Sequence, residues 1–408
     1  MNTQAIKTAV NDDWDRRGLP AWTYHNEALH ALEITELFQT HWQIAGHVND
    51  LPKPGDYLTF DLGSERAVIV RGGDGVVRAF HNLCRHRGSR VAVGDRGSCR
   101  NALVCPFHGW AYNLDGTLRG AARPDSFPPL DKTAFGLRPV DMEIWHGLIF
   151  LRFRQGPQPS VAALLKPFDA EIAQYRASEM VPAGPGKIWT NDIAVNWKSV
   201  RDVDNEGYHV AMAHPALQDL YGSTYRDIPM TGGLNMSRGH FQPQAGRRWS
   251  VRNYVKLAGG PDWLPRDLRA VWSYYGMFPN NVIIATPETI QFYQELPVAV
   301  NRATVRGISY RRPEEDRTQR LARYLSYRID RDTYAEDTQL SIWSNESMKS
   351  SAFEGFHLSD LEHLVRAHHD RLRTLLPVMT LDKPPPDSEM AAINAAMKSQ
   401  QQDAAKAL

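Results

Sequence analysis

The chain has 408 residues, of which 42% are hydrophobic and 23% are charged, so it is long enough to bury the core of more than one domain. Its 47 Lys and Arg residues balance 46 Asp and Glu residues, for a net charge of +1. This balance argues against nucleic acid or an anionic membrane as a partner. We see neither a membrane-spanning apolar stretch nor a secretory signal at the N-terminus.

The first 155 residues divide into two regions with different sequence patterns. Residues 1–42 are expected to be loop and helix that pack on the larger domain, with helical apolar spacing at 27–42. Residues 43–155 contain short β-rich runs separated by Gly, Asp and Pro, which predicts a small antiparallel β domain. The clearest runs are 56–63, 66–72, 76–82 and 146–153.

A Pro- and Gly-containing segment at 154–161 suggests a boundary, after which residues 156–385 alternate between helical and strand-like patterns. We expect helices at 161–177, 196–213, 314–350 and 359–376, with strands at 272–278, 281–286, 289–297 and 303–311. A sheet followed by helices that cover it indicates an α+β domain. Residues 386–408 form a tail that is either helical or frayed.

The only three cysteines, Cys84, Cys99 and Cys105, lie within 22 residues of one another. An odd, small number in a long chain argues against a disulfide framework and for a reducing compartment, so we expect a cytoplasmic protein. The clustering itself suggests metal chemistry, with three small buried side chains as the alternative.

Two of these cysteines each have a histidine close by, as Cys84-Arg-His86 and Cys105-Pro-Phe-His108. Two cysteines and two histidines also suit zinc. However, a zinc finger typically places both histidines on one helix, whereas here they lie in two separate β- and turn-rich segments. That arrangement allows two thiolates on one iron and two imidazoles on the other iron of a [2Fe–2S] cluster.

These motifs resemble the Rieske signature, Cys-x-His followed by Cys-x-x-His, and the chain is similar to Rieske non-haem iron oxygenases from about residue 40 to 380. The likeness continues at Gly109, Trp110, Tyr112 and Gly116. It implies that the [2Fe–2S] ligands are Cys84, His86, Cys105 and His108. The segment between the motifs, 87–104, is long for the family, and Cys99 within it matches no ligand position.

A Rieske cluster that serves an oxygenase must pass electrons to a second metal, and His209 and His214 are candidates to hold it. Five residues correspond to about 500° of helical rotation, or roughly 140° away from one face. Both side chains therefore reach one iron only if the helix breaks or contains a π-bulge between them. Pro215 is consistent with a helix end at this point.

The stretch 196–215 also resembles the family's mononuclear iron motif, which implies that His209 and His214 are iron ligands. A carboxylate must complete the 2-His-1-carboxylate face. The family's late Glu-Asp pair corresponds to residues 336–337, which points to Asp337. Glu336 is the rival candidate and Asp332 is a more distant one.

The resemblance further implies that electrons cross between subunits of a head-to-tail homotrimer, through an acidic residue that links a Rieske histidine to an iron-ligand histidine. Glu206 occupies this position, three residues before His209, and Asp202 is the second choice on the same helical face. The alternative is a surface acid that pairs with Lys198 or Arg201. His108 is the better candidate for the Rieske end of the link.

The family implies an all-β Rieske domain followed by a helix-grip catalytic domain, which makes this chain the terminal oxygenase component. Its cofactors would be a [2Fe–2S] cluster and a mononuclear Fe(II) that activates O2. The chain contains neither a Gly-rich dinucleotide loop nor a second cysteine cluster. We therefore expect electrons from NAD(P)H to arrive through a separate reductase that carries flavin and an iron–sulfur centre.

Within the family, the pattern is most similar to the quaternary-ammonium branch of glycine betaine, stachydrine and carnitine oxygenases. The segments that carry this likeness are Glu206, 291–297, 324–337 and 350–355. The implied reaction is oxidative N-demethylation of a small betaine with release of formaldehyde. The alternatives are hydroxylation of an aromatic ring or aromatic acid, and a non-catalytic electron carrier or zinc-binding module.

A methylammonium substrate would suit a cavity lined by aromatic rings. We expect at least two rings from residues 208–343 to line the space above His209, His214 and Asp337, with one Arg, Lys, His or amide group farther out. Aromatic residues in this region also have the ordinary alternative of filling the core. They include Tyr208, Trp263, Trp272, Tyr274, Tyr275, Phe292, Tyr293 and Trp343.

Overall fold

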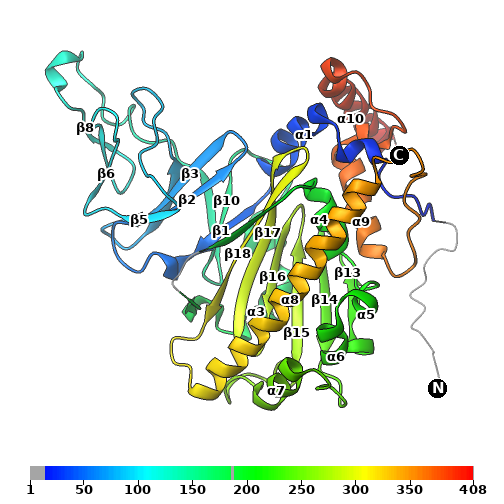
Figure 1. Cartoon of the computed structure of the whole chain (residues 1–408). Coiled ribbons are helices and arrows are strands. Elements are labelled where there is room, and N and C mark those ends of the chain that lie inside the picture. Colours follow the sequence, from blue (N-terminus) through cyan, green and yellow to red (C-terminus); the bar gives the residue numbers. More distant parts are fainter. Residues whose placement is uncertain (1–13, 185–187, 408) are drawn as a thin grey trace.

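The computed structural model describes residues 14–184 and 188–407, and its central feature is an antiparallel eight-stranded sheet (Figure 1). Its strand order is β11-β18-β17-β16-β15-β14-β13, and β12 also pairs with β18. The strands are β11 Val181–Pro182, β12 Trp189–Ile193, β13 Arg226–Pro229, β14 Leu234–His240, β15 Val271–Met277, β16 Asn281–Ala285, β17 Thr289–Ala299 and β18 Arg302–Arg311. The four strands expected between residues 272 and 311 are confirmed.

Three smaller antiparallel sheets form the N-terminal part. The first has the order β4-β3-β2-β5, with β2 Asp56–Leu62, β3 Glu65–Arg71, β4 Val77–His81 and β5 Arg96–Ser98. The second joins β1 Gln43–His47 to β10 Leu148–Arg152 and β9 Asp141–Trp145. The third contains β6 Ala102–Val104, β7 Ala111–Asn113 and β8 Leu118–Gly120. Figure 1 shows β6 and β8 at the end of the molecule that points away from the large sheet.

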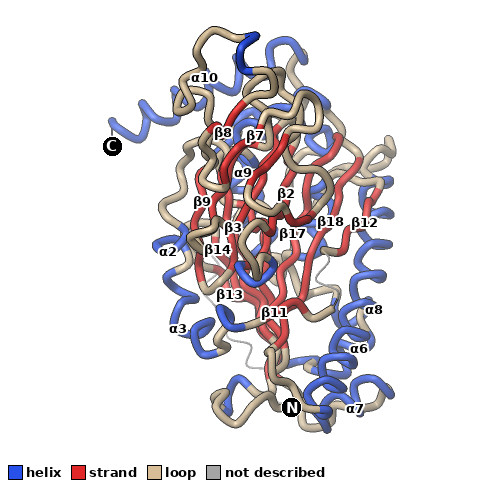
Figure 2. Tube along the Cα trace, turned by 90° about the vertical axis from the view of Figure 1, so that its left-hand side faces the viewer, coloured by secondary structure: helices blue, strands red, loops and turns tan. Residues whose placement is uncertain are grey.

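Helices flank the strands, which form the interior of the molecule (Figure 2). The longest, α8 Arg317–Ser347, runs across one face of the large sheet (Figure 1). A reciprocal capping box between Asp316 and Gln319 defines its start. The others are α1 Glu27–Glu33, α2 Val161–Leu164, α3 Lys166–Gln174, α4 Trp197–Asp204, α5 Val210–Ala213, α6 Pro215–Leu220, α7 Trp249–Leu257, α9 His363–Leu375 and α10 Met390–Ala407.

Two of the expected helices are interrupted. The helix expected at 161–177 divides into α2 and α3, and the helix expected at 196–213 ends at Asp204, so that α5 begins separately at Val210. The tail after residue 386 is helical as α10. In the described residues, no helix combines the length and the apolar character needed to span a membrane. The first thirteen residues, on which the prediction of no secretory signal depends, lie outside the described part of the chain.

The N-terminal segment is joined to α4 by a buried ion pair. The Lys198 ammonium meets the Glu33 carboxylate, and both side chains are fully buried. Glu33 also accepts a hydrogen bond from the Trp197 indole N–H at 2.8 Å. Next to this pair, the Tyr24 hydroxyl contacts Asp202. These contacts fix α4, and α4 leads directly into the segment that holds His209 and His214.

Removing one partner of this pair leaves the other charge buried without compensation. We expect Glu33→Ala to lower the free energy of unfolding by about 3–5 kcal/mol. Glu36→Ala is the matched control, because Glu36 pairs with Lys398 at the surface and its loss should cost about 1 kcal/mol or less. Urea denaturation followed by circular dichroism measures both. Equal losses in the two variants would show that the buried pair does not hold α4.

Candidate metal centres and substrate cavity

The two Cys/His motifs form a pair of loops with the same backbone pattern. In the first, the Gly88 N–H donates to the Cys84 carbonyl at 3.0 Å, and in the second the Gly109 N–H donates to the Cys105 carbonyl, also at 3.0 Å. Gly88 and Gly109 have φ values of 78° and 69°, in the left-handed region that glycine adopts readily. These glycines therefore let each loop turn tightly around its cysteine and histidine.

The four side chains of these loops fit a [2Fe–2S] cluster. Cys84 and Cys105 are both 2% exposed, and their thiols lie within hydrogen-bonding reach of each other. The His86 and His108 rings are 4.7 Å apart between centroids. The Nδ1 atoms of both histidines are buried and make no hydrogen bond. Buried ring nitrogens without partners are expected where a metal uses their lone pairs.

Neighbouring side chains hold this constellation in place. The Trp110 ring stacks on His86 at an interplanar angle of 5°. The Tyr112 hydroxyl accepts from the Arg85 N–H at 2.8 Å and lies 3.2 Å from the Cys84 sulfur. Cys99 is separate from this pair, since its thiol donates to the Gly55 carbonyl.

The second candidate centre contains His209, His214 and Asp337, whose ligand atoms converge. The two Nε2 atoms are 2.9 Å apart, and Asp337 Oδ1 lies 3.3 Å from His209 Nε2 and 2.8 Å from His214 Nε2. Ligands bound at about 2.1 Å and roughly at right angles around one ion would be about 3 Å apart. The three atoms therefore have the spacing of one face of a 2-His-1-carboxylate site.

The break between the helices brings the two histidines together. His209 lies just before α5 and His214 just after it, with φ −115° and ψ 77° at His214. The expected break lies at His214 itself, where the backbone leaves the helical conformation, and residues 210–213 form a helical turn rather than a π-bulge. Asp337 arrives from the middle of α8, so the site joins two segments more than 120 residues apart.

Each histidine donates its other ring nitrogen to a carboxylate. His209 Nδ1 contacts Glu206, and His214 Nδ1 donates to Glu336 at 2.8 Å. A proton held on Nδ1 leaves the lone pair on Nε2, which is the atom that faces Asp337. Asp337 is half-buried, and its Oδ1 atom faces the same two Nε2 atoms. All three groups therefore present electron pairs to the same point.

The structure separates the candidates that the sequence leaves open. Glu206 contacts His209, whereas Asp202 lies beyond reach of it and is bound by Tyr24 and His369. Glu206 lies after the end of α4, so it does not share a helical face with Asp202. Asp332 is exposed and pairs with Arg331.

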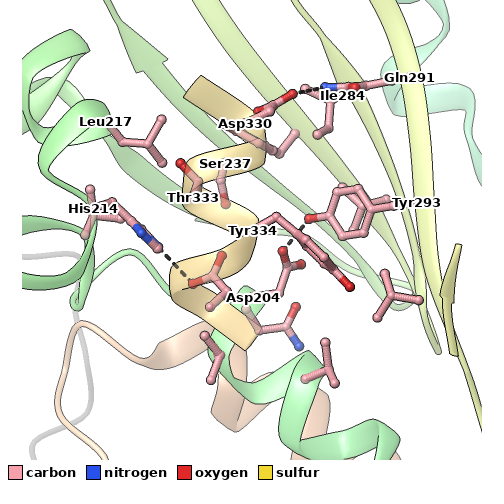
Figure 3. Close-up of a pocket in the computed structure, with 18 of the residues that line it drawn as sticks. Asp204, His214, Leu217, Ser237, Ile284, Gln291, Tyr293, Asp330, Thr333 and Tyr334 are labelled. Carbon is pink, nitrogen blue, oxygen red and sulfur yellow. Dashed lines mark hydrogen bonds and ion pairs between the residues drawn. The ribbon is translucent and has the colours of Figure 1, made fainter. Parts of the chain in front are cut away.

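A cavity of about 340 Å³ opens above the convergent atoms. Its walls include His209, His214 and Asp337, and its aromatic lining comes from Trp189, Tyr221, Tyr225, Tyr274, Phe292, Tyr293, Tyr327 and Tyr334. The expected aromatic lining is confirmed. Arg331 and the amide of Gln291 also line the cavity, as expected for a polar group farther out. Figure 3 shows His214 and Tyr293 on opposite sides of α8.

Several lining residues were not singled out from the sequence. Tyr221 and Tyr225 are examples, because nothing in their spacing distinguishes them from aromatic residues of the core. Trp272 and Tyr275, which were candidates, are buried in the core, while Tyr208, Trp263 and Trp343 are exposed. Asp330 and Gln291 form a polar pair in the wall.

Comparisons with known families match both parts of the chain. Residues 41–132 match the Rieske [2Fe-2S] domain, and residues 182–377 match the ring hydroxylating alpha subunit catalytic domain. The chain therefore belongs to the Rieske non-haem iron oxygenases, and its α+β architecture agrees with this assignment.

Curated relatives act on ammonium compounds. The glycine betaine monooxygenase oxygenase subunit of Chromohalobacter salexigens is 36% identical over 199 residues, or 49% of this chain and 43% of the relative. The carnitine monooxygenase oxygenase subunit of Escherichia coli K12 is 31% identical over 201 residues, or 49% of this chain and 53% of the relative. In these alignments, the chain spans about half the length of the relatives.

Solved structures share the fold over a longer range. The quaternary ammonium Rieske monooxygenase CntA in complex with L-carnitine superposes with a TM-score of 0.70 at 21% identity, over 88% of this chain and 95% of CntA. Naphthalene 1,2-dioxygenase from Rhodococcus sp. superposes with a TM-score of 0.71 at 19% identity, over 92% of this chain and 96% of the dioxygenase.

We predict that Asp337→Ala abolishes mononuclear iron binding and turnover but leaves the visible spectrum of the cluster intact, because the two constellations lie in different parts of the fold. Iron analysis combined with absorption spectroscopy measures both. Asp332→Ala is the matched control on the same helix, and it should retain mononuclear iron. Full iron content in the Asp337 variant would remove this residue from the ligand set.

Proposed function

We propose that the chain is the oxygenase component of a multicomponent monooxygenase that oxidises an N-methyl group of a small quaternary ammonium compound. The observation that carries this proposal is the convergence of His209, His214 and Asp337 at the wall of a cavity rich in aromatic rings. The likeness to glycine betaine and carnitine monooxygenases supports the substrate class. A hydroxylated methyl group on nitrogen would collapse to formaldehyde and the demethylated amine.

The proposal assigns Cys84, His86, Cys105 and His108 to the [2Fe–2S] cluster, and His209, His214 and Asp337 to a mononuclear iron. When bound, these groups would supply single electrons and the activation of dioxygen. Glu206 and Glu336 would orient the two iron-binding imidazoles by accepting hydrogen bonds from their Nδ1–H groups. They thereby keep both Nε2 lone pairs directed at one point.

The aromatic rings would bind the cationic end of the substrate. Each ring face attracts a cation by about 0.5–2 kcal/mol. Tyr221 and Tyr225 stack with their centroids 5.5 Å apart, and both line the cavity with Phe292 and Tyr293. Ring faces also exclude water and, in contrast to carboxylates, do not compete as metal ligands. They suit a methylated ammonium group held close to the iron ligands.

Electrons would reach the catalytic site from a neighbouring copy of the chain in a head-to-tail homotrimer. Within one chain, the end of the molecule that carries β6 lies far from α5 and α8 (Figure 1). One of the similar solved structures, that of a quaternary ammonium Rieske monooxygenase, has been used to describe inter-subunit electron transfer in that protein. A separate reductase with flavin and an iron–sulfur centre would supply the electrons.

Exposed apolar side chains at both ends of this route support a head-to-tail contact. Phe107, beside His108, is 55% exposed, and Leu83 is 49% exposed close to Cys84. At the other end, Tyr208 and Met212 flank His209 with 58% and 89% exposure. A contact between the first patch on one copy and the second patch on another copy is heterologous. Such contacts close into a ring when the rotation between copies permits it.

Hydroxylation of an aromatic ring is the second candidate, because the fold also matches naphthalene 1,2-dioxygenase. A neutral aromatic substrate would need a cavity without unpaired charge. The cavity instead contains one carboxylate, Asp330, whose polar partner among the described residues is the neutral Gln291 amide, which favours a cation. A colourless protein that contains zinc would contradict both candidates.

We predict that Glu206→Gln keeps both metals bound but severely slows oxidation of the reduced cluster by the mononuclear site. The reason is that the neutral amide lacks the negative charge with which Glu206 would link His209 to a Rieske histidine of the neighbouring copy. Stopped-flow absorption of the reduced protein, mixed with substrate and oxygen, measures this rate. Glu336→Gln makes the same change at the other histidine and should slow the rate much less. Rapid cluster re-oxidation in E206Q would point to another route.

A substrate panel tests the activity itself. With a surrogate reductase, we expect formaldehyde release from at least one of glycine betaine, choline, carnitine and stachydrine, and no hydroxylated product from benzoate or naphthalene. The physical reason is that the ring faces and carboxylates of the cavity stabilise a methylammonium cation. Hydroxylation of the aromatic compounds without formaldehyde formation would replace the proposed reaction by the second candidate.

A further inference from the structure

The wall of the cavity contains a carboxylate, Asp330, that is neither a proposed metal ligand nor a partner of the two histidines. Asp330 lies on α8, seven residues before Asp337. Seven residues are almost two helical turns, so the two carboxylates share one face of α8 and lie about 10 Å apart along its axis. In Figure 3, Asp330 lies one turn from Tyr334, next to Gln291 and Ile284.

Asp330 has one polar partner and no counter-ion among the residues that the structure describes. The Gln291 amide donates to its carboxylate at 2.6 Å, and the Gln291 carbonyl accepts from the Ser309 hydroxyl at 2.8 Å. No Lys, Arg or His of the described ranges, 14–184 and 188–407, forms an ion pair with it. The neighbouring Arg331 pairs with Asp332 instead. Burial raises the pKa of Asp330 to about 6, so the group still carries its charge at neutral pH.

The charge of Asp330 lies close to the aromatic part of the cavity. Burial raises the pKa of the Tyr274 hydroxyl, and the adjacent Tyr221 and the charge of Asp330 raise it further. The Tyr221 and Tyr274 hydroxyls are 3.4 Å apart, and both residues line the cavity with Asp330. The same end of the cavity therefore combines aromatic rings with a carboxylate whose described partner is a neutral amide.

A half-buried carboxylate without a cationic partner still carries a desolvation cost, and a cation from outside the chain can offset this cost. We propose that Asp330 is the counter-ion for the ammonium group of the substrate, and is the residue that makes the cavity select a cation over a neutral compound of the same shape. This inference rests on the proposed function and deepens it by assigning the charge recognition to one residue.

The spacing along α8 suits this role. A separation of about 10 Å between the two carboxylates leaves room for a methyl group that faces the metal ligands and for its nitrogen, which lies between them and Asp330. The ammonium group can thus meet a carboxylate that is too far from His209 and His214 to bind the same metal. Asp337 would bind the metal at one end of this span, and Asp330 would bind the ammonium group at the other.

The alternative is that Asp330 serves only to accept the hydrogen bond from Gln291. Asparagine distinguishes the two roles, because its side-chain carbonyl can still accept from Gln291 while its charge is lost. Asp332→Asn is the matched control. It removes the same charge two residues away, from an exposed side chain that does not line the cavity.

The experiment measures equilibrium binding to the anaerobic holoprotein by calorimetry, without turnover. The probes are choline, glycine betaine, carnitine and 3,3-dimethylbutan-1-ol, in which carbon replaces the quaternary nitrogen of choline. We expect the wild type to bind at least one ammonium compound more tightly than the alcohol. Asp330→Asn should weaken that binding by about tenfold or more, leave the affinity for the alcohol unchanged and retain both metals, while Asp332→Asn should match the wild type.

Three outcomes would overturn the inference: equal binding of ammonium compounds and the alcohol by the wild type, unchanged ammonium binding in Asp330→Asn, or the same weakening in Asp332→Asn. The wild-type comparison requires no variant, so equal binding there overturns the inference even if Asp330→Asn is unstable. Formaldehyde release is assayed separately. If ammonium binding depends on Asp330 but no formaldehyde forms, Asp330 is the counter-ion and the proposed demethylation is wrong. If formaldehyde forms but Asp330→Asn binds ammonium compounds as the wild type does, demethylation stands and Asp330 is not the counter-ion.

Discussion

The catalytic part of the molecule depends on bringing two imidazoles and one carboxylate to a common point, with contacts of 2.8–3.3 Å. Such groups repel or neutralise one another unless a metal or protons lie between them. The backbone must therefore be held rigidly on both sides. The buried Glu33–Lys198 pair fixes α4 from the N-terminal side, and Arg201 joins α4 to Glu295 on β17. These ion pairs fix the position of the segment that carries His209 and His214.

Carboxylates surround the proposed iron site in successive layers, and their partners determine what each one does. Asp337 faces both Nε2 atoms, and Glu206 and Glu336 hold the opposite ring nitrogens. Asp204 pairs with Arg201. In contrast to these, the Asp330 carboxylate is held by a neutral amide. One functional group, the carboxylate, thus contributes a proposed metal ligand, two groups that position the histidines, a structural ion pair and the proposed charge selector, because the local environment of each differs.

Much of the fold was predictable because its patterns are local. Short β-rich runs bounded by turn residues located strands β2 and β3, strand-like runs located β15 and β17, and the helical pattern at 314–350 located α8. The helix expected at 196–213 was wrong in extent, because the backbone breaks after Asp204 to turn His209 toward Asp337. The tertiary contacts of the proposed metal site override helix propensity there. Asp202 and Glu206 were equivalent by helical spacing, and that break separates them.

The sequence by itself determined the chemistry of the donor set, because the Cys/His spacings and the His209–His214–Asp337 pattern each lie within a short segment or match a family motif. It could not determine which side chains would share one cavity. Tyr221, Gln291 and Asp330 come from the end of α6, β17 and α8, and their proximity exists only after the sheet and the long helix pack together. Spacing along α8 placed Asp330 on the face of Asp337. Only the tertiary structure showed that no cation of the described ranges pairs with it, because ion pairs form between segments that are distant in sequence.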